Sequence, residues 1–319
     1  MPKRAEKCAV CGCVEKRVTG PEAPGFRATA GDVAFEQPPY HIYECTQCGL
    51  LYRDVILSAE EFSQYYAAAK YEGWETAGYY PTETGVLSVL RALPPRSRIL
   101  DFGCSSGRLL AGLLPEYDCH GFEINDEAAA VAAMKGLRMF SLAEIEAGEA
   151  GKFAAIVLVD VFEHLSDPVE TLRTLTRLLA PDGVLLLVTG NGDAPACRRD
   201  PAQFWYFRII EHVCMLTRRS AEFIAAESGL KLASWQTLSH YKLTLRERLV
   251  QRTQDFAYWQ FRGRTLLART VLPFIPLLRR ARLADVAPAY TCWSDHVLAI
   301  FRASLGERGD ERAPTRINE

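Results

Sequence analysis

Between residues 98 and 189 the chain alternates between short apolar runs and segments whose apolar positions recur at helical spacing. The apolar runs, which are typical of buried strands, lie at 98–102, 119–123, 137–140, 154–160 and 184–189. Strands that alternate with helices form a parallel sheet covered on both faces. The sequence therefore predicts an α/β fold with a doubly wound sheet, whose ligand binds at the carboxyl ends of the strands.

The helix expected after residue 160 carries the clearest local signals. Asp167 can cap its N-terminus, Pro168 suits the first helical position and Glu170 occupies the third. One face is apolar and is formed by Val169, Leu172, Leu175, Leu178 and Leu179. Residues 181–183, Pro-Asp-Gly, are expected to form the turn that leads into the next strand.

Further helices are expected at 58–71, where Ser58 and Glu61 form a capping pattern, at 82–93 and at 217–229. Further strands are expected at 230–238 and 295–303. These patterns divide the chain into a cysteine-bearing unit (1–57), a helical linker or lid (58–96), a core (97–240 and 291–303), a helical insertion before the last strand (241–290) and a disordered tail (304–319).

Two C-x2-C-G units, with Cys8 and Cys11 in one and Cys45 and Cys48 in the other, predict a metal site near the N-terminus. Four thiolates suit a closed tetrahedral Zn²⁺ site, which has no open position for water, so a structural role is expected. The second unit lies in HIYECTQCGLLYRD, which is typical of a hairpin in a zinc ribbon. Two chance pairs of buried cysteines are the alternative interpretation, and the other cysteines are expected to be small core residues.

The segment ILDFGCSSGRLL at 99–110 predicts a strand, a glycine turn and a helix N-terminus. Ser105 stands where the dinucleotide pattern needs its second glycine, which argues against a nicotinamide or flavin cofactor. Asp101 ahead of the turn favours a cationic ligand, since a carboxylate can hold an ammonium group and repels a phosphate. Asp101, Glu123 and Asp160 each lie at or near a predicted strand end, and we expect them around one crevice.

The net charge of -2 over 319 residues argues against a chain that mainly binds nucleic acid. The first residues show no apolar segment of the kind found in a signal peptide, so a cytoplasmic protein is expected.

The motifs DFGCSSG, GFEIND and VDVFEHLSDPVETL, followed by LLAPDGVLLLVTGN, resemble class I S-adenosylmethionine-dependent methyltransferases. The two C-x2-C-G units followed by a Tyr-Tyr helix are similar to the zinc-ribbon-bearing branch that methylates sugars, quinones and related small molecules. The resemblance runs from about residue 8 to 238 and returns in the last strand. It implies a Rossmann-like, seven-stranded sheet, S-adenosylmethionine as cofactor and Zn²⁺ in the ribbon.

The resemblance also implies roles for individual residues. Gly103, Cys104, Ser105 and Gly107 would pass under the methionine moiety, with Asp101 near its amino group. Glu123, followed by Ile124, would hold the ribose hydroxyls, and Asp160 would lie beside the sulfonium. Ser141 and Leu142 fall where the adenine is contacted. Ser105 in place of a glycine and Ala154 in place of an acid depart from the family pattern. For each carboxylate, a helix cap or a solvated loop charge is the alternative.

Methyl transfer to a hydroxyl needs a base, and His164 and His212 are the candidates, with packing or capping as the alternative role. The fourth strand lacks the Asn-Pro-Pro-aromatic signature of enzymes that act on nitrogen, which favours an oxygen or carbon acceptor. Tyr65, Tyr66 and Tyr71 are expected to close over the site as a lid or to pack against the ribbon.

The insertion carries ten basic residues and two acids between positions 242 and 282, interleaved with aromatic residues. This pattern is typical of an interfacial helical hairpin at the inner membrane face, or of a segment that binds a lipid-linked or phosphorylated acceptor. A helical lid or a dimer contact explains the pattern equally well. The leading hypothesis is therefore methyl transfer to an oxygen or carbon of a sugar, quinone or lipid-linked glycan precursor. An rRNA methyltransferase and a non-catalytic zinc-ribbon binding protein are the alternatives.

Overall fold

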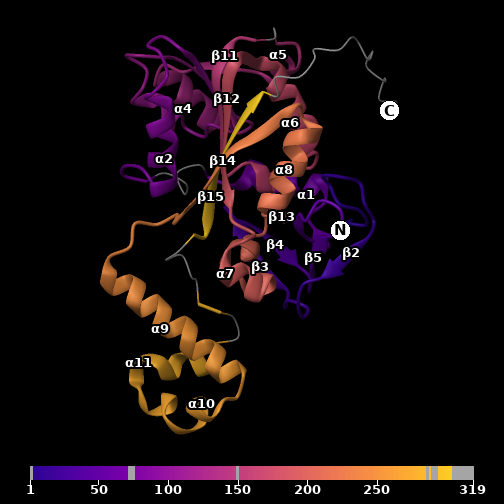
Figure 1. The fold of residues 1–319 in the computed structure, drawn as a ribbon, viewed down its shortest axis with the longest axis vertical. Helices are drawn as coiled ribbons and strands as arrows, with labels where there is room; N and C mark the ends of the chain where they lie inside the picture. The colour runs from indigo at the N-terminus through magenta and orange to yellow at the C-terminus, as the bar shows by residue number, and fades with distance from the viewer. Residues whose placement is uncertain (1–2, 71–75, 149–150, 285–286, 289–293, 304–319) are drawn as a thin grey trace.

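The structure, a computed structural model, describes residues 3–70, 76–148, 151–284, 287–288 and 294–303 (Figure 1). Tyr71, Cys292, the beginning of the expected core segment 291–303 and the expected tail at 304–319 lie outside the described residues. A central sheet lies between two layers of helices, a cysteine-bearing unit with small sheets packs beside it, and a helical insertion projects from one end.

The central sheet has seven strands in the order β10-β9-β8-β11-β12-β15-β14. Their bounds are β8 Arg98–Phe102, β9 Asp118–Phe122, β10 Arg138–Phe140, β11 Phe153–Val159, β12 Leu179–Gly190, β14 Leu230–Leu238 and β15 His296–Ala303. The first five strands in this order are parallel, and β15 runs antiparallel to both β12 and β14. The predicted α/β fold with a doubly wound, seven-stranded sheet is confirmed.

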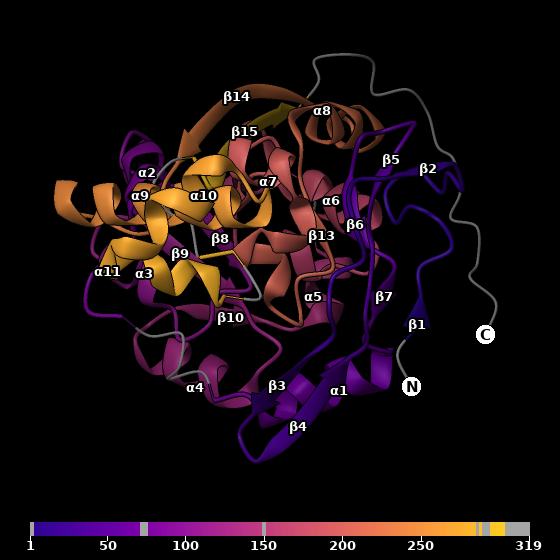
Figure 2. The same ribbon diagram turned by 90° about the horizontal axis from the view of Figure 1, so that it is seen from below.

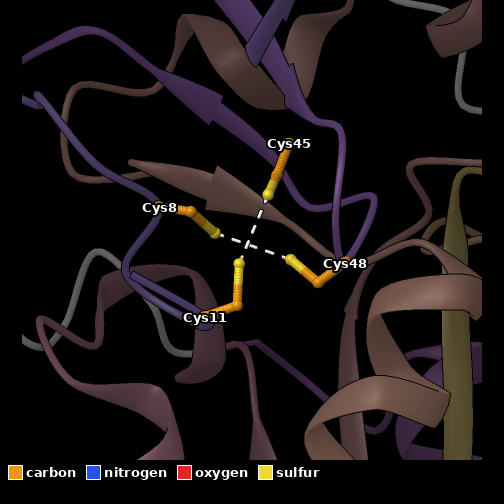
Figure 3. Close-up of side chains that lie close together, drawn as sticks. All are labelled: Cys8, Cys11, Cys45 and Cys48. Atoms are coloured by element: carbon orange, nitrogen blue, oxygen red, sulfur yellow. Dashed lines mark hydrogen bonds between the residues drawn. The ribbon is translucent and has the colours of Figure 1, made fainter. Parts of the chain in front are cut away.

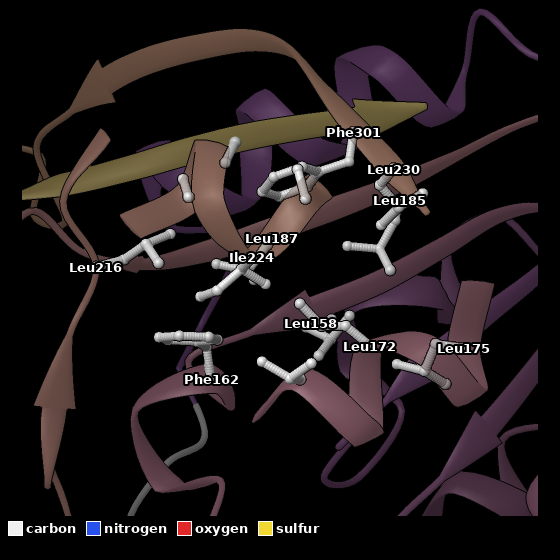
Figure 4. Close-up of a cluster of buried hydrophobic side chains, with 14 of the residues drawn as sticks. Leu158, Phe162, Leu172, Leu175, Leu185, Leu187, Leu216, Ile224, Leu230 and Phe301 are labelled. Atoms are coloured by element: carbon white, nitrogen blue, oxygen red, sulfur yellow. The ribbon is translucent and has the colours of Figure 1, made fainter. Parts of the chain in front are cut away.

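Helices cover both faces of this sheet (Figure 1). The bounds are α2 Pro81–Leu90, α3 Arg108–Ala111 and α4 Asp126–Met134 on one face, and α5 Leu142–Glu146, α6 Pro168–Leu178 and α8 Arg218–Glu227 on the other. Strand β12 serves both cores, because Leu185 and Leu187 point to one face and Leu186 to the other. Figure 4 shows the core on the α6 and α8 side, which includes Phe162, Leu172 and Phe301.

Helix α6 begins as the sequence predicts, since the Asp167 carboxylate accepts the Glu170 amide at 3.1 Å and Pro168 follows the cap. Its end differs from the prediction. Leu179 is the first residue of β12 and pairs with Phe153, so it does not belong to the helix face. The register shifts before Val184 pairs with Ala155, and the expected turn at 181–183 is instead an irregular part of the strand.

The cysteine-bearing unit contains β1 Lys3–Arg4, β2 Lys16–Val18, β3 Phe26–Ala30, β4 Val33–Gln37, β5 Ile42–Cys45, β6 Leu51–Arg53 and β7 Val55–Ile56. The hairpin expected around the second C-x2-C-G unit is β5–β6. The sequence did not predict that β13 (Cys214–Met215), from the core, extends this sheet in the order β13-β6-β5-β2. The unit is therefore joined to the core by the backbone pairing of β13 with β6 as well as by side chains.

Arg53 on β6 makes several polar contacts that connect this unit to the core. The side chain is fully buried and donates to the carbonyls of Ile209 and Ile210, both at 3.0 Å, and to that of Phe207. It also donates to Gln37 Oε1 at 3.0 Å. The segment that carries His212 is thus held by a residue of the cysteine-bearing unit.

Helix α1 (Ala59–Ala68) begins with the predicted capping box between Ser58 and Glu61. It packs on the β3–β4 hairpin through an edge contact between Tyr65 and Phe35, whose ring centroids lie 5.4 Å apart. The Tyr65 hydroxyl donates to Glu211 Oε1 at 2.9 Å. Tyr65 therefore packs against the N-terminal unit and also reaches the segment before His212.

The insertion contains α9 Leu245–Arg262, α10 Leu266–Thr270, η5 Leu272–Phe274, α11 Pro276–Arg279 and η6 Arg280–Arg282. It has a small core of its own around Tyr258 and Leu272. Arg199 at the end of α7 (Pro195–Arg199) binds Asp255 at 2.8 Å and anchors α9 to the core. Figure 2 shows the insertion in front of the sheet when the molecule is seen from below. Among the described residues, no helix is long and apolar enough to cross a membrane.

Candidate functional site

The glycine turn follows β8 and leads into α3. Gly103 and Gly107 adopt left-handed conformations, with φ of 83° and 73°. A Cβ on Gly103 would lie 2.5 Å from Val161 Cγ2, so a larger residue there would collide with the segment after β11. The Gly103 and Cys104 amides both donate to Phe122 O, at 2.8 and 3.0 Å, which fixes the turn against the end of β9.

Ser105, which stands where the family pattern has a glycine, adopts a left-handed conformation with φ of 46°. Such a conformation is strained for a residue with a side chain, and strained residues cluster at functional sites. Its amide donates to Glu123 Oε2 at 2.8 Å, while its buried hydroxyl has no hydrogen-bond partner among the described residues. The loop is thus pulled toward the acid that follows β9.

Glu123 accepts a second backbone amide, that of Asn125, on Oε1 at 2.9 Å. A carboxylate has about four lone-pair positions, so both oxygens keep acceptor capacity for two hydroxyl groups. Ile124 next to it is exposed and is available to cover a ligand. This arrangement suits a bidentate acceptor for a ribose.

Asp101 at the end of β8 is buried. Burial raises the pKa of its carboxyl to about 8, and the Glu123 and Glu83 carboxylates add to the rise. A cationic group bound beside Asp101 would reverse this effect, because an opposite charge favours the ionised carboxylate.

Ser141 and Leu142 lie at the start of α5. The Ser141 hydroxyl caps this helix by accepting the Glu144 amide at 3.2 Å, and the Glu144 carboxylate accepts the Ser141 amide at 2.8 Å. Leu142 is exposed at the same edge of the sheet. The side chain of Ser141 therefore has a structural partner already, and Leu142 is the freer of the two to contact a ligand.

Asp160 follows β11 in a left-handed conformation, with φ of 52°. Its Oδ1 accepts the Tyr206 hydroxyl at 3.1 Å and lies 3.5 Å from His296 Nε2. Burial acts to raise the pKa of this carboxyl, but the contact with His296 and the charges of His296, His240 and His212 together hold the pKa below its ordinary value. Asp160 is thus an ionised group at the carboxyl edge.

Glu163, three residues after Asp160 in the chain, is fully buried. It accepts the Thr189 hydroxyl at 2.8 Å and contacts the Tyr206 hydroxyl. Burial raises the pKa of Glu163 to about 8, and Asp160 adds to the rise. A neutral Glu163 can donate to Tyr206, which in turn donates to Asp160, so one proton chain joins the two acids through the tyrosine.

The structure brings the two predicted histidines together, with the rings of His164 and His212 4.9 Å apart. Burial lowers the pKa of both imidazoles. His212 Nδ1 lies 2.9 Å from Tyr206 O, and since a carbonyl only accepts, this nitrogen carries the proton. His164 comes from the η2 turn (Phe162–His164) and is partly exposed, whereas His212 is buried.

Sequence reasoning missed a second histidine pair. His240 follows β14 and His296 begins β15, and their rings stack 4.5 Å apart beside Asp160. The signal was present in the order of the strands: β15 runs antiparallel, so its first residues lie at the edge where the parallel strands end. Tyr206, on η4 (Trp205–Arg208), was also missed.

The four predicted metal ligands Cys8, Cys11, Cys45 and Cys48 converge, with all sulfurs within 4.8 Å of one another (Figure 3). The Cys8–Cys48 and Cys11–Cys45 sulfur distances are 3.5 and 3.3 Å. Four sulfurs bound to Zn²⁺ at about 2.3 Å would lie about 3.8 Å apart, so the cluster needs little adjustment to hold the ion. Both units form the same turn, because the Gly12 amide donates to Cys8 O and the Gly49 amide to Cys45 O, each at 2.9 Å.

Comparison with known proteins agrees with this geometry. Residues 78–234 match a family described as a methyltransferase domain. A ubiquinone biosynthesis O-methyltransferase of Xanthomonas oryzae pv. oryzae is 31% identical over 118 residues, which cover 34% of this chain and 46% of that protein. One from Hahella chejuensis is 26% identical over 208 residues, which cover 61% of this chain and 74% of that protein. The chain thus spans under half the length of the Xanthomonas relative.

A solved structure shows the same fold. It is a chain of the complex between the Haloferax volcanii Trm112 methyltransferase activator and a methyltransferase, with a TM-score of 0.52 at 14% identity, covering 78% of this chain and 99% of that one. The family match identifies residues 78–234 as a methyltransferase domain, and the strand order and the glycine turn with its three acids agree with the S-adenosylmethionine-dependent class that the sequence resembles.

Proposed function

We propose that this protein transfers the methyl group of S-adenosylmethionine to an oxygen or carbon of a small molecule such as a sugar, a quinone or a lipid-linked glycan precursor. The observation that carries the proposal is the arrangement of Asp101, the glycine turn and Glu123 at one edge of the sheet. Asp101 would hold the ammonium group, Gly103, Cys104, Ser105 and Gly107 would lie under the methionine moiety, and Glu123 with Ile124 would hold the ribose.

The remaining contacts follow from the order of the strands. Leu142 and the backbone of Ser141 would contact the adenine, since both lie where β10 ends. Asp160 would face the sulfonium, because it is ionised and follows the central strand β11. A methyl transfer of this kind needs alignment of the acceptor behind the methyl group and exclusion of water.

His164 is the proposed base, and His212 is its neighbour. A hydroxyl acceptor must lose a proton, and a neutral imidazole that is partly exposed can take it. His212 is buried and bound to Tyr206 O, so it is better placed to position His164 than to meet the acceptor. This observation favours oxygen over carbon.

The zinc ion is proposed as a structural cofactor held by the four cysteines, which would close the N-terminal unit against α8. Arg219 on α8 already donates to the carbonyls of Thr46 and Gln47, both at 2.7 Å, within the second C-x2-C-G unit. An ion held by four thiolates has no free position for a substrate, so it supplies folding energy rather than chemistry.

We further propose that the acceptor is attached to a lipid and that the protein contacts the inner membrane face peripherally. It is supported by the insertion, whose tip exposes apolar side chains next to basic ones. Phe274 is 80% exposed and Leu266 77%. Isolated apolar side chains at the surface are common, but several on one basic helical unit suit an interface with anionic lipid.

The test is formation of S-adenosylhomocysteine by the full chain with a panel of phenolic quinone precursors, sugars and lipid-linked sugars. Turnover with one acceptor class and a large loss of kcat in His164→Gln support the proposal. Methylation of ribosomal RNA alone would favour the rRNA alternative, and binding of acceptors without cofactor binding would favour a non-catalytic protein.

A further inference from the structure

Three side chains from three parts of the chain meet at the carboxyl edge beside the proposed methyl position. Asp160 follows β11, His240 follows β14 and His296 begins β15. One donor atom from each can be chosen so that all three lie within 4.8 Å of one another. Two imidazoles and one carboxylate are a common set of ligands for divalent transition-metal ions.

The ring nitrogens of the histidines in this cluster make no well-aligned hydrogen bond. His296 is fully buried, and its two ring nitrogens face carboxylate oxygens of Asp160 and Asp295 at 3.5 and 3.3 Å without the alignment of a hydrogen bond. Nδ1 of His240 has no hydrogen-bond partner among the described residues. Buried polar atoms without partners are rare and point to a missing water or ion.

The surroundings match those of metal-binding histidines. Asp295 Oδ2 lies 3.3 Å from His296 Nδ1, on the side of the ring away from Asp160. Its Oδ1 accepts the His240 amide at 3.0 Å. Histidines that bind metals commonly have a carboxylate at the second ring nitrogen, which orients the ring and fixes its tautomer.

The neighbouring group of Glu163, His164 and His212 is less suited to an ion. Both oxygens of Glu163 already contact hydroxyl groups, those of Thr189 and Tyr206. In contrast, the Asp160 side chain remains partly exposed. The ring of His240 stacks on Tyr80 with centroids 4.3 Å apart, which helps to hold this imidazole in place.

We propose that Asp160, His240 and His296 form a binding site for a divalent transition-metal ion, separate from the cysteine cluster. Three protein ligands leave coordination positions open for an acceptor. If the proposed methyl transfer is correct, and this role rests on it, the ion would act as a Lewis acid that lowers the pKa of an acceptor hydroxyl. The competing explanation is an ion pair in which a protonated His296 is shared by Asp160 and Asp295.

The test is binding of Co²⁺ to the full chain after removal of metals with a chelator. Bound cobalt is counted after gel filtration, and its affinity is measured by titration. Wild type is expected to bind one ion more per chain than His296→Gln or His240→Gln. Any cobalt that these variants still hold at the site should be bound at least about 10-fold more weakly than in wild type. His41→Gln, which changes a histidine of the N-terminal unit, is the matched control and should behave as wild type.

His240 is only partly buried, so His240→Gln still tests the site if His296→Gln fails to fold. S-adenosylhomocysteine binding is measured in parallel, because a variant that loses the ion and still binds this ligand is folded and separates the metal site from the proposed function. Equal cobalt content in wild type and in both folded site variants would overturn the proposal, as would loss of the ion in His212→Gln but not in His240→Gln.

Discussion

The backbone amide of Ser105 donates to Glu123 Oε2 at 2.8 Å, and this bond joins the glycine turn to the proposed ribose acid. A residue that replaces a glycine thereby contributes to the site through its backbone. The left-handed conformation at Ser105 is the one that directs this amide toward Glu123. The two parts of the cofactor site are therefore preorganised with respect to each other.

Asp101 makes cofactor binding depend on pH. Burial raises the pKa of its carboxyl to about 8, so the free protein holds it mostly neutral at lower pH, and binding of an ammonium group must release that proton. The affinity for S-adenosylmethionine is therefore expected to rise as pH increases from about 6 to 8.

The control for this prediction is Asp101→Asn. The α-amino group of the cofactor itself loses its proton near pH 8, at about 7.7–8.0, so the readout is the difference between the two proteins in calorimetric titrations. The rise should be absent in Asp101→Asn. An identical pH profile in both proteins would remove Asp101 from the ammonium site.

Arg53 is expected to stabilise the fold through the segment that carries His212. Arg53→Met leaves the carbonyls of Phe207, Ile209 and Ile210 without their donor, at an expected cost of about 3 kcal/mol in the free energy of unfolding. Urea denaturation measures this. Arg27→Met, at an exposed position on β3, should cost less than about 0.5 kcal/mol, and similar costs for the two variants would contradict the account.

Removal of zinc is expected to loosen the N-terminal unit and a distant part of the core together. Because β13 pairs with β6, a chelator should increase hydrogen exchange at residues 51–53 and also at 214–215. Cys11→Ser should lose the zinc found by elemental analysis, while Cys13→Ser, which changes a cysteine outside the cluster, should keep it. Retention of zinc in Cys11→Ser would show that these four sulfurs are not the ligands.

The insertion is expected to bring the protein to anionic vesicles. In sedimentation with phosphatidylglycerol vesicles, Phe274→Ser should reduce the bound fraction several-fold, because it removes an exposed apolar side chain from the tip. Met134→Ser on α4, at an equally exposed position, is the control. Wild type that stays in the supernatant, or equal losses in both variants, would leave the lipid proposal without support.

The sequence predicted the parts of the fold that depend on local pattern. The five parallel strands and the α6 cap follow from apolar runs and from Asp167, Pro168 and Glu170. Asp101 and Glu123 lie at one edge as expected, because the carboxyl ends of parallel strands coincide.

Pairings between distant segments were not predictable in this way. A strand of two residues, Cys214–Met215, carries no periodicity, and its pairing with β6 depends on the whole fold. His240 and His296 were missed because the place of β15 between β12 and β14 decides which end of it faces the site. Leu179 fits the helical spacing, but backbone pairing with Phe153 overrides that preference.

The most direct test of the central claim is calorimetric titration of the full chain with S-adenosylhomocysteine. Wild type should bind. Glu123→Gln should bind about 10- to 100-fold more weakly, because an ionised acceptor becomes a neutral amide. Glu127→Gln, which changes an exposed carboxylate on α4, should match wild type. Absence of binding by wild type, or equal affinities for wild type and Glu123→Gln, would contradict the assignment of this edge of the sheet as the cofactor site.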